Sequence, residues 1–155
     1  MKWIDATGFL IYLAMLAFFD LKTHLLPAAL IVTGGATGLL LRLAAVFSGE
    51  MSPAILLWRY GSGLIWGILL LLLVRPSRRG IGKGDGLSFL SFAFWQENTF
   101  VFSLLLLSLL LLASFGLLLT PKGESRIRRR LPLMPFVFAA ALGLTLAGLL
   151  EGASP

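Results

Sequence analysis

The chain has 155 residues, of which 58% are hydrophobic and 13% are charged. Soluble domains contain about 45–50% apolar and about 25% charged residues. The composition therefore excludes a soluble enzyme and a nucleic-acid-binding module, although the net charge of +6 would suit nucleic acid in a soluble protein. It predicts an integral membrane protein that binds no nucleic acid. The chain has no Cys and one His, so we expect no disulfide and no metal site.

Six apolar segments follow one another along the chain. They cover residues 6–21, 26–47, 54–74, 85–96, 100–119 and 131–150. A membrane-spanning helix needs about 20 apolar residues. We therefore expect one all-α domain over residues 1–155, a polytopic bundle of about six transmembrane helices with no soluble domain. The oligomeric state stays open.

Positive charges gather in alternate connections and predict the orientation. Ten of the 13 Lys and Arg residues lie in the first, third and fifth connections: Lys22; Arg75, Arg78, Arg79 and Lys83; Lys122, Arg126, Arg128, Arg129 and Arg130. The acids Asp5, Glu50, Glu97 and Glu151 lie on the other side, with Lys2, Arg42 and Arg59. Because basic loops stay in the cytoplasm, we expect both termini outside.

The fourth segment is short. Residues 85–96 would form a helix of about 18 Å, whereas the apolar core of a bilayer is about 30 Å thick. A re-entrant half-helix would carry the basic run at 126–130 to the outside. The charges therefore favour a full crossing, completed by residues 96–99.

Small residues recur in three segments and predict close helix packing. They are Gly34, Gly35 and Gly38; Gly61, Gly63 and Gly67; and Ala139, Gly143 and Gly148.

Two carboxylates occupy unusual positions. Asp20 closes the first segment and Asp85 opens the fourth, so the topology puts both at the cytoplasmic face. An ionisable residue in an apolar run is costly and is a functional candidate by default. Two structural interpretations compete: Asp85 could cap its helix, and Asp20 could mark a helix end beside Lys22. His24 fits a loop that faces water or headgroups.

Glycine occupies every second position before and after Asp85, at Gly80, Gly82, Gly84 and Gly86. Such a flexible backbone costs folding entropy. The pattern predicts a sharp bend or a close approach by a substrate strand. Of the alanine substitutions at Gly82, Gly84 and Gly86, we expect Gly84→Ala to lower activity most and Gly86→Ala least.

A pair of carboxyls can hydrolyse a peptide bond. Two carboxyls about 3 Å apart tend to hold one proton between them. The ionised member activates a water molecule, and the protonated member donates to the substrate carbonyl. This chemistry needs neither metal nor cofactor, so we expect none.

The order of motifs resembles the type IV prepilin peptidases, membrane aspartic proteases of the Gly-x-Gly-Asp kind. The matching motifs are Asp20 followed by Pro27, the run Gly82-Lys83-Gly84-Asp85, and a Pro-rich opening of the last helix, 131–136. The chain departs from the family pattern at Leu87, often Lys, and at Ala28, often Asn.

The resemblance implies an aspartic endopeptidase of the bacterial or archaeal inner or plasma membrane. It would cleave the leader of pilin-like precursors, with membrane lipids around it. Asp20 and Asp85 would be the catalytic pair, and Gly82, Gly84 and Gly86 the active-site loop. The chain is similar to the short form, without the Cys-containing amino-terminal part, so we expect no N-methyltransferase activity.

Three alternatives stay open. A presenilin-like protease shares the Gly-x-Gly-Asp chemistry, but Phe19 replaces its usual Tyr before Asp20. A proton-coupled carrier or channel would use Asp20 and Asp85 as relay groups, and no third acid is found at mid-depth. A catalytically inactive assembly partner of a pilus or secretion system would keep the fold alone.

Overall fold

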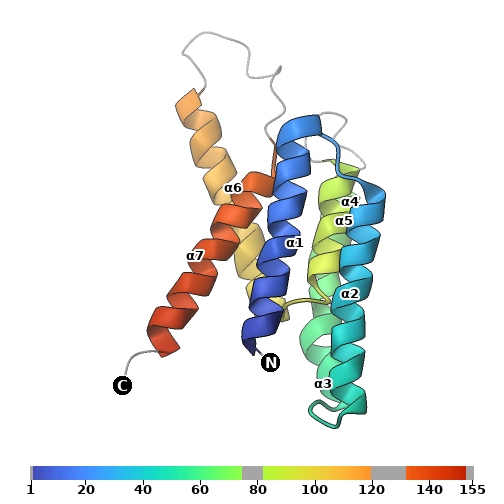
Figure 1. Cartoon of the computed structure of the whole chain (residues 1–155). Helices are drawn as coiled ribbons and strands as arrows, with labels where there is room; N and C mark the ends of the chain where they lie inside the picture. The colour runs from blue at the N-terminus through green and yellow to red at the C-terminus, as the bar shows by residue number, and fades with distance from the viewer. Residues whose placement is uncertain (1, 75–81, 120–131, 153–155) are drawn as a thin grey trace. The chain divides into compact units, whose positions relative to one another are not determined.

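The computed structural model describes residues 2–74, 82–119 and 132–152, and every regular element in these ranges is helical. The described residues form seven α-helices, which Figure 1 labels. They are α1 (Lys2–Thr23), α2 (Ala28–Phe47), α3 (Pro53–Ile55), α4 (Leu64–Val74), α5 (Lys83–Phe92), α6 (Asn98–Leu119) and α7 (Met134–Gly152). A π-helical turn, η1 (Leu56–Tyr60), and a 3₁₀ turn, η2 (Gly61–Gly63), connect α3 to α4.

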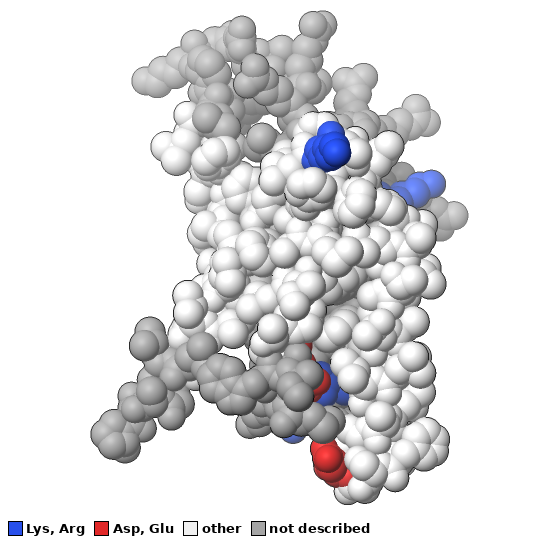
Figure 2. Space-filling model, viewed as in Figure 1, with Lys and Arg blue, Asp and Glu red and all other residues white. Residues whose placement is uncertain are grey.

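The expected fold class, an all-helical membrane protein, is confirmed. Within the described residues, four stretches are long and apolar enough to cross a bilayer: Asp5–Thr23, Ala28–Phe47, Pro53–Leu73 and Asn98–Leu118. Figure 2 shows that the visible surface of the described residues is largely uncharged. Six crossings stay a prediction, because α5 has only 10 residues and the apolar stretch Met134–Gly148 of α7 is shorter than the four spans.

The orientation also stays a prediction. Of the ten basic residues on which it depends, Lys22 and Lys83 are described and both are exposed. The others lie outside the described residues, at 75–79 and 122–130.

The chain divides into two compact units, one of Met1–His24 with Leu104–Pro155 and the other of Leu25–Ser103. In the first unit, α1 packs along α7. The rings of Phe115 in α6 and Phe136 in α7 lie 5.5 Å apart between their centroids. Helix α7 therefore contacts both α1 and α6 within this unit.

In the second unit, α5 packs against both α2 and α4. Glycine lets these helices approach closely. A methyl group built on Gly67 would lie 2.6 Å from the backbone nitrogen of Leu90, and one on Gly63 would lie 3.1 Å from Cβ of Ala93. The helices therefore touch nearly backbone to backbone, as in other membrane bundles.

The glycines of α2 contribute to the same packing. A methyl group on Gly35 would lie 3.1 Å from Cβ of Ser91, and one on Gly38 only 2.7 Å from the indole of Trp95. Gly34 is buried as well. The predicted packing role is confirmed at these glycines and at Gly63 and Gly67.

The same packing is not seen for α7 within its own unit, and it is weak for Gly61. Among the described residues, nothing lies within 4 Å of a methyl group built on Gly143 or Gly148, and Ala139 is exposed. A packing role for these three residues stays a prediction. A methyl on Gly61 meets only Leu57, at 3.4 Å, in the adjoining η1. Small size alone therefore does not indicate whether a neighbouring helix is present.

The contacts of α5 also bear on whether the fourth segment crosses. Gly86, near its start, packs against Leu71, whereas Ala93, just after its end, packs against Gly63. The chain thus runs antiparallel to α4. Glu97 then pairs with Arg59 at 3.1 Å, beside the start of the preceding span. In a re-entrant hairpin, the chain would return to the membrane face from which it entered. The antiparallel packing of α5 along α4, which ends at the Arg59–Glu97 pair, favours the full crossing instead.

Candidate active site

Asp85 lies inside the first turn of α5, not at the helix opening. The helix begins at Lys83, two residues before the expected start, and ends at Phe92, before the expected end at residue 96. Gly82 is the residue that precedes the helix, and its N–H donates to Oδ2 of Asp85 at 2.9 Å. A carboxylate in this position also interacts favourably with the helix dipole. The local sequence therefore fixes the Asp85 side chain over the start of α5.

The predicted active-site loop is largely helical. Gly84 and Gly86 belong to α5, and Gly82 has an ordinary extended conformation with φ of −79°. The only glycine with positive φ in the described residues is Gly49. The described glycines near Asp85 therefore show no bend that needs positive φ, Gly80 lies outside the described residues, and close approach by a substrate strand stays a prediction.

Gly84 and Gly86 contact neighbouring segments. A methyl group on Gly84 would lie 3.1 Å from Cβ of Leu26, and one on Gly86 would lie 2.7 Å from Cδ2 and 3.2 Å from the backbone nitrogen of Leu71. Gly86 is buried, and Gly84 is half-buried. Gly86 is thus the more tightly packed of the two, whereas the order expected for the cleavage rates of the alanine variants stays a prediction.

Asp20 is held by the last helix. It lies in the last turns of α1 with only 7% of its surface exposed. Its Oδ2 accepts a hydrogen bond of 3.0 Å from the backbone N–H of Met134, the first residue of α7. The carboxylate therefore caps a helix that begins 114 positions later in the chain. The sequence indicated an unusual carboxylate but not this partner.

Each aspartate is positioned within its own unit. Asp20 belongs to the unit of α1 and α7, and Asp85 to the unit of α2, α4 and α5. Both bind a backbone N–H at a helix start, so the capping interpretation of Asp85 is confirmed, although as a first-turn residue and not as the N-cap. Their pairing as a catalytic dyad stays a prediction.

A polar anchor at the other end of α5 escaped the sequence analysis. Arg42 of α2 is 5% exposed and donates to the carbonyl of Trp95 at 2.7 Å and to that of Phe94 at 3.4 Å. Its guanidinium also lies 4.6 Å from the centre of the Tyr60 ring. The Trp95 indole N–H donates to the carbonyl of Gly34 at 2.8 Å. An arginine inside the apolar run 26–47 was the available signal.

The remaining candidates are less constrained. His24 is exposed and has a left-handed backbone with φ of 52°, in agreement with a loop position. Within the described ranges, no three metal-ligating side chains gather. No known protein family, curated protein or solved structure matches the chain.

Proposed function

We propose that this protein is a membrane-embedded aspartic endopeptidase that removes the leader peptide of pilin-like precursors at the cytoplasmic face of the membrane. Asp20 and Asp85 form the catalytic pair. One carboxyl activates a water molecule, and the other protonates the carbonyl of the scissile bond. The proton belongs to the pair, so acid and base are not assigned to single residues.

The observation that carries the proposal is the contact between Leu26 and Gly84. Leu26 follows Asp20 by six residues, and Gly84 immediately precedes Asp85. Six residues of extended chain span at most about 20 Å. The short connection therefore permits the two carboxyls to meet, as a shared-proton pair requires.

The hydrogen bonds of the aspartates also suit this role. Each carboxylate is oriented by a backbone N–H, from Met134 for Asp20 and from Gly82 for Asp85. Asp20 is buried as well. A catalytic group acts efficiently when its rotamer is fixed before substrate binds.

The test is cleavage of a pilin-like precursor by the purified protein in lipid nanodiscs. We expect Asp20→Asn and Asp85→Asn each to lower the rate by at least about 100-fold. An asparagine carbonyl still accepts the capping hydrogen bond, so both variants keep the fold. Glu50→Gln, which removes an exposed acid elsewhere, is the matched control. Near wild-type rates in either asparagine variant would rule out the aspartyl mechanism.

A catalytically inactive assembly partner is the second candidate. It is favoured by the capping hydrogen bonds, which give both aspartates a structural use without any reaction. If the wild-type protein binds the precursor in the same nanodiscs but releases no leader, this candidate replaces the peptidase. For a peptidase, we expect the new amino terminus to remain unmethylated when S-adenosylmethionine is present.

A further inference from the structure

A cleft of about 310 Å³ opens at the end of the second unit where α5 terminates. Six residues line it: Trp58, Arg59, Ser62, Glu97, Asn98 and Thr99. The first three come from η1 and η2, and the others from the start of α6 and the residue before it. The cleft thus lies at the opposite end of α5 from Asp85, and the proposed peptidase does not use it.

The helix positions indicate the membrane depth of the cleft. Asn98 begins the apolar span Asn98–Leu118, and the cleft residues Trp58, Arg59 and Ser62 lie in the first half of the span Pro53–Leu73. The start of a span lies near the boundary between the apolar core and the headgroups. Trp58 is 81% exposed and its neighbour Leu57 is 76% exposed. Tryptophan is enriched at this boundary, where one side of its ring meets lipid tails and its N–H meets polar groups.

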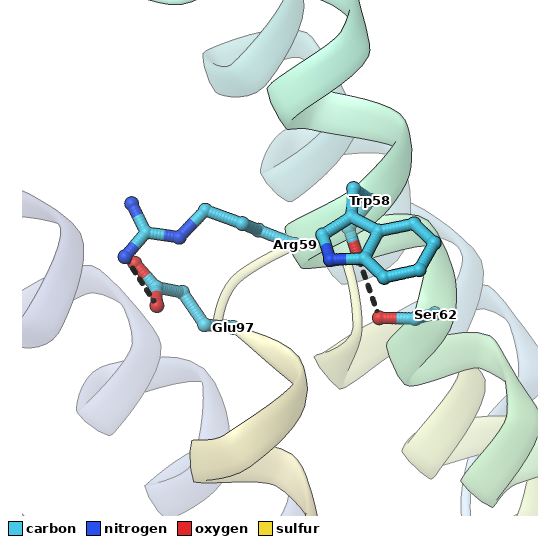
Figure 3. A network of polar contacts seen from close by, with 4 residues as sticks. All are labelled: Trp58, Arg59, Ser62 and Glu97. Atoms are coloured by element: carbon cyan, nitrogen blue, oxygen red, sulfur yellow. Dashed lines mark hydrogen bonds and ion pairs between the residues drawn. The ribbon is translucent and has the colours of Figure 1, made fainter.

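The charged groups of the cleft are a pair that a ligand can separate. Arg59 and Glu97 lie 3.1 Å apart, and their side chains are 56% and 37% exposed. Figure 3 shows Arg59 reaching from η1 to Glu97, while the Ser62 hydroxyl donates to the backbone carbonyl of Trp58. An exposed ion pair contributes at most about 1 kcal/mol, so a ligand that offers both charges replaces it at little cost.

Neutral donors lie beside the pair. The indole N–H of Trp66 donates to Oδ1 of Asn98 at 2.7 Å, which directs the amide oxygen to Trp66 and leaves the NH₂ group as a donor. The Thr99 hydroxyl lines the cleft as well. Arg59 and Trp58 belong to a π-helical turn, a rare geometry that is frequent at functional sites.

We propose that this cleft binds the headgroup of a phospholipid that carries both a phosphate and a primary ammonium group. The phosphate binds the guanidinium of Arg59 with support from Asn98 and Thr99, and the ammonium donates to Glu97. The acyl chains lie along the exposed apolar side of η1. A headgroup of this kind leaves neither charge of the cleft unpaired.

The charge pattern also predicts selectivity. An anionic headgroup that binds Arg59 would leave the Glu97 carboxylate without a positive partner, because such a headgroup carries no ammonium group. A choline headgroup has no N–H to donate to the carboxylate. We therefore expect ethanolamine phospholipids to bind more tightly than glycerol or choline phospholipids.

The test is native mass spectrometry of the full chain in detergent, titrated separately with phosphatidylethanolamine, phosphatidylglycerol and phosphatidylcholine. For the wild type, we expect ethanolamine lipid to bind about tenfold more tightly than either of the others, the value of one charge-assisted hydrogen bond. Arg59→Gln and Glu97→Gln should each abolish the preference. Glu50→Gln, an exposed acid that does not line the cleft, should keep it.

Soluble phosphoethanolamine and inorganic phosphate distinguish the lipid from a free phosphate compound. Both should bind far more weakly than the lipid, because they lack acyl chains. Equal affinity for the three lipids, a preference that survives Glu97→Gln, or soluble phosphoethanolamine binding as tightly as the lipid would each overturn the proposal. The wild-type comparison needs no substitution, so an unfolded variant cannot obscure the answer.

Discussion

Helices α5 and α7 each have a carboxylate hydrogen-bonded to the backbone at their start, yet they are held in different ways. Asp85, which caps α5, is only three residues from its partner Gly82, whereas Asp20 reaches the start of α7 from α1. Glycines on α5 and its neighbours are in tight contact. Among the described residues, none lies within 4 Å of a methyl group built on Gly143 or Gly148 of α7.

The difference shows two ways to fix a membrane helix. The ten-residue α5 has little apolar length, so close backbone contacts with α2 and α4 and the Arg42 anchor hold it. The longer α7 packs along α1 and has one long-range polar bond at its start. We therefore expect α5 to be sensitive to added volume and α7 to be sensitive to the loss of that bond.

The largest effect is expected at Gly67. An added methyl group would lie 2.6 Å from the backbone nitrogen of Leu90, which cannot move without displacing α5. We expect Gly67→Ala to lower the free energy of unfolding by about 3 kcal/mol. Chemical denaturation in detergent, followed by tryptophan fluorescence, measures this change. Gly143→Ala on α7 is the control and should be neutral or slightly stabilising, because helical Ala is favoured over Gly by about 1 kcal/mol.

Loss of the Arg42 anchor should come next. Arg42→Met keeps an apolar side chain of similar length but leaves the carbonyls of Phe94 and Trp95 without this donor. We expect a loss of about 2 kcal/mol in the same denaturation experiment. Arg59→Gln, which changes an exposed arginine, should cost less than about 0.5 kcal/mol. Equal effects of the two substitutions would show that Arg42 does not anchor the end of α5.

The two glycines beside Asp85 should differ. Gly86→Ala places a methyl group against the side chain and backbone of Leu71, whereas Gly84→Ala meets only the side chain of Leu26. We expect Gly86→Ala to cost about 1.5 kcal/mol and Gly84→Ala less than about 1 kcal/mol. The reverse order in unfolding experiments would mean that the tight packing of α5 does not extend to its first turn.

The smallest effect is expected at the start of α7. Asp20→Ala removes the acceptor for the Met134 N–H and should cost about 1 kcal/mol. Asp20→Asn keeps a carbonyl acceptor and should cost less than half as much. Hydrogen exchange at the Met134 amide is the local measurement. Unchanged protection in Asp20→Ala would show that this hydrogen bond does not hold α7.

The sequence predicted the helical segments well, because apolar length and charge placement are properties of the chain alone. The bounds of α2 differ from the predicted 26–47 by two residues at the start. Helix α5 was placed less well, because its first turn contains Lys83 and two glycines, which do not resemble an apolar helix. The η1 and η2 turns had no sequence signal at all.

The candidate site was predicted only as a set of residues. Sequence position singled out Asp20 and Asp85, but not the partner of Asp20, because Met134 is brought near by tertiary packing. The glycines were assigned to a loop, since alternating glycine usually indicates flexible backbone. In the sequence, Arg42 was counted only among the charges expected outside the cytoplasm. A buried arginine, however, needs hydrogen-bond acceptors nearby, and these could have been sought.

The central claim is that Asp20 and Asp85 meet, and cysteine cross-linking tests it most directly. The chain has no Cys, so any cross-link in Asp20→Cys/Asp85→Cys comes from the introduced pair. A direct disulfide requires Cβ atoms about 3.5–4.5 Å apart. Two aspartates that share a proton hold their Cβ atoms further apart than this, so a short bifunctional thiol reagent bridges the pair. Leu26→Cys/Gly84→Cys is the positive control, and Asp20→Cys/Glu97→Cys, with Glu97 expected on the other membrane face, is the negative control. The account predicts rapid cross-linking of the Asp20/Asp85 pair in membranes, detected by peptide mass spectrometry. No cross-link at that pair, under conditions where the positive control forms one, would contradict the aspartyl dyad.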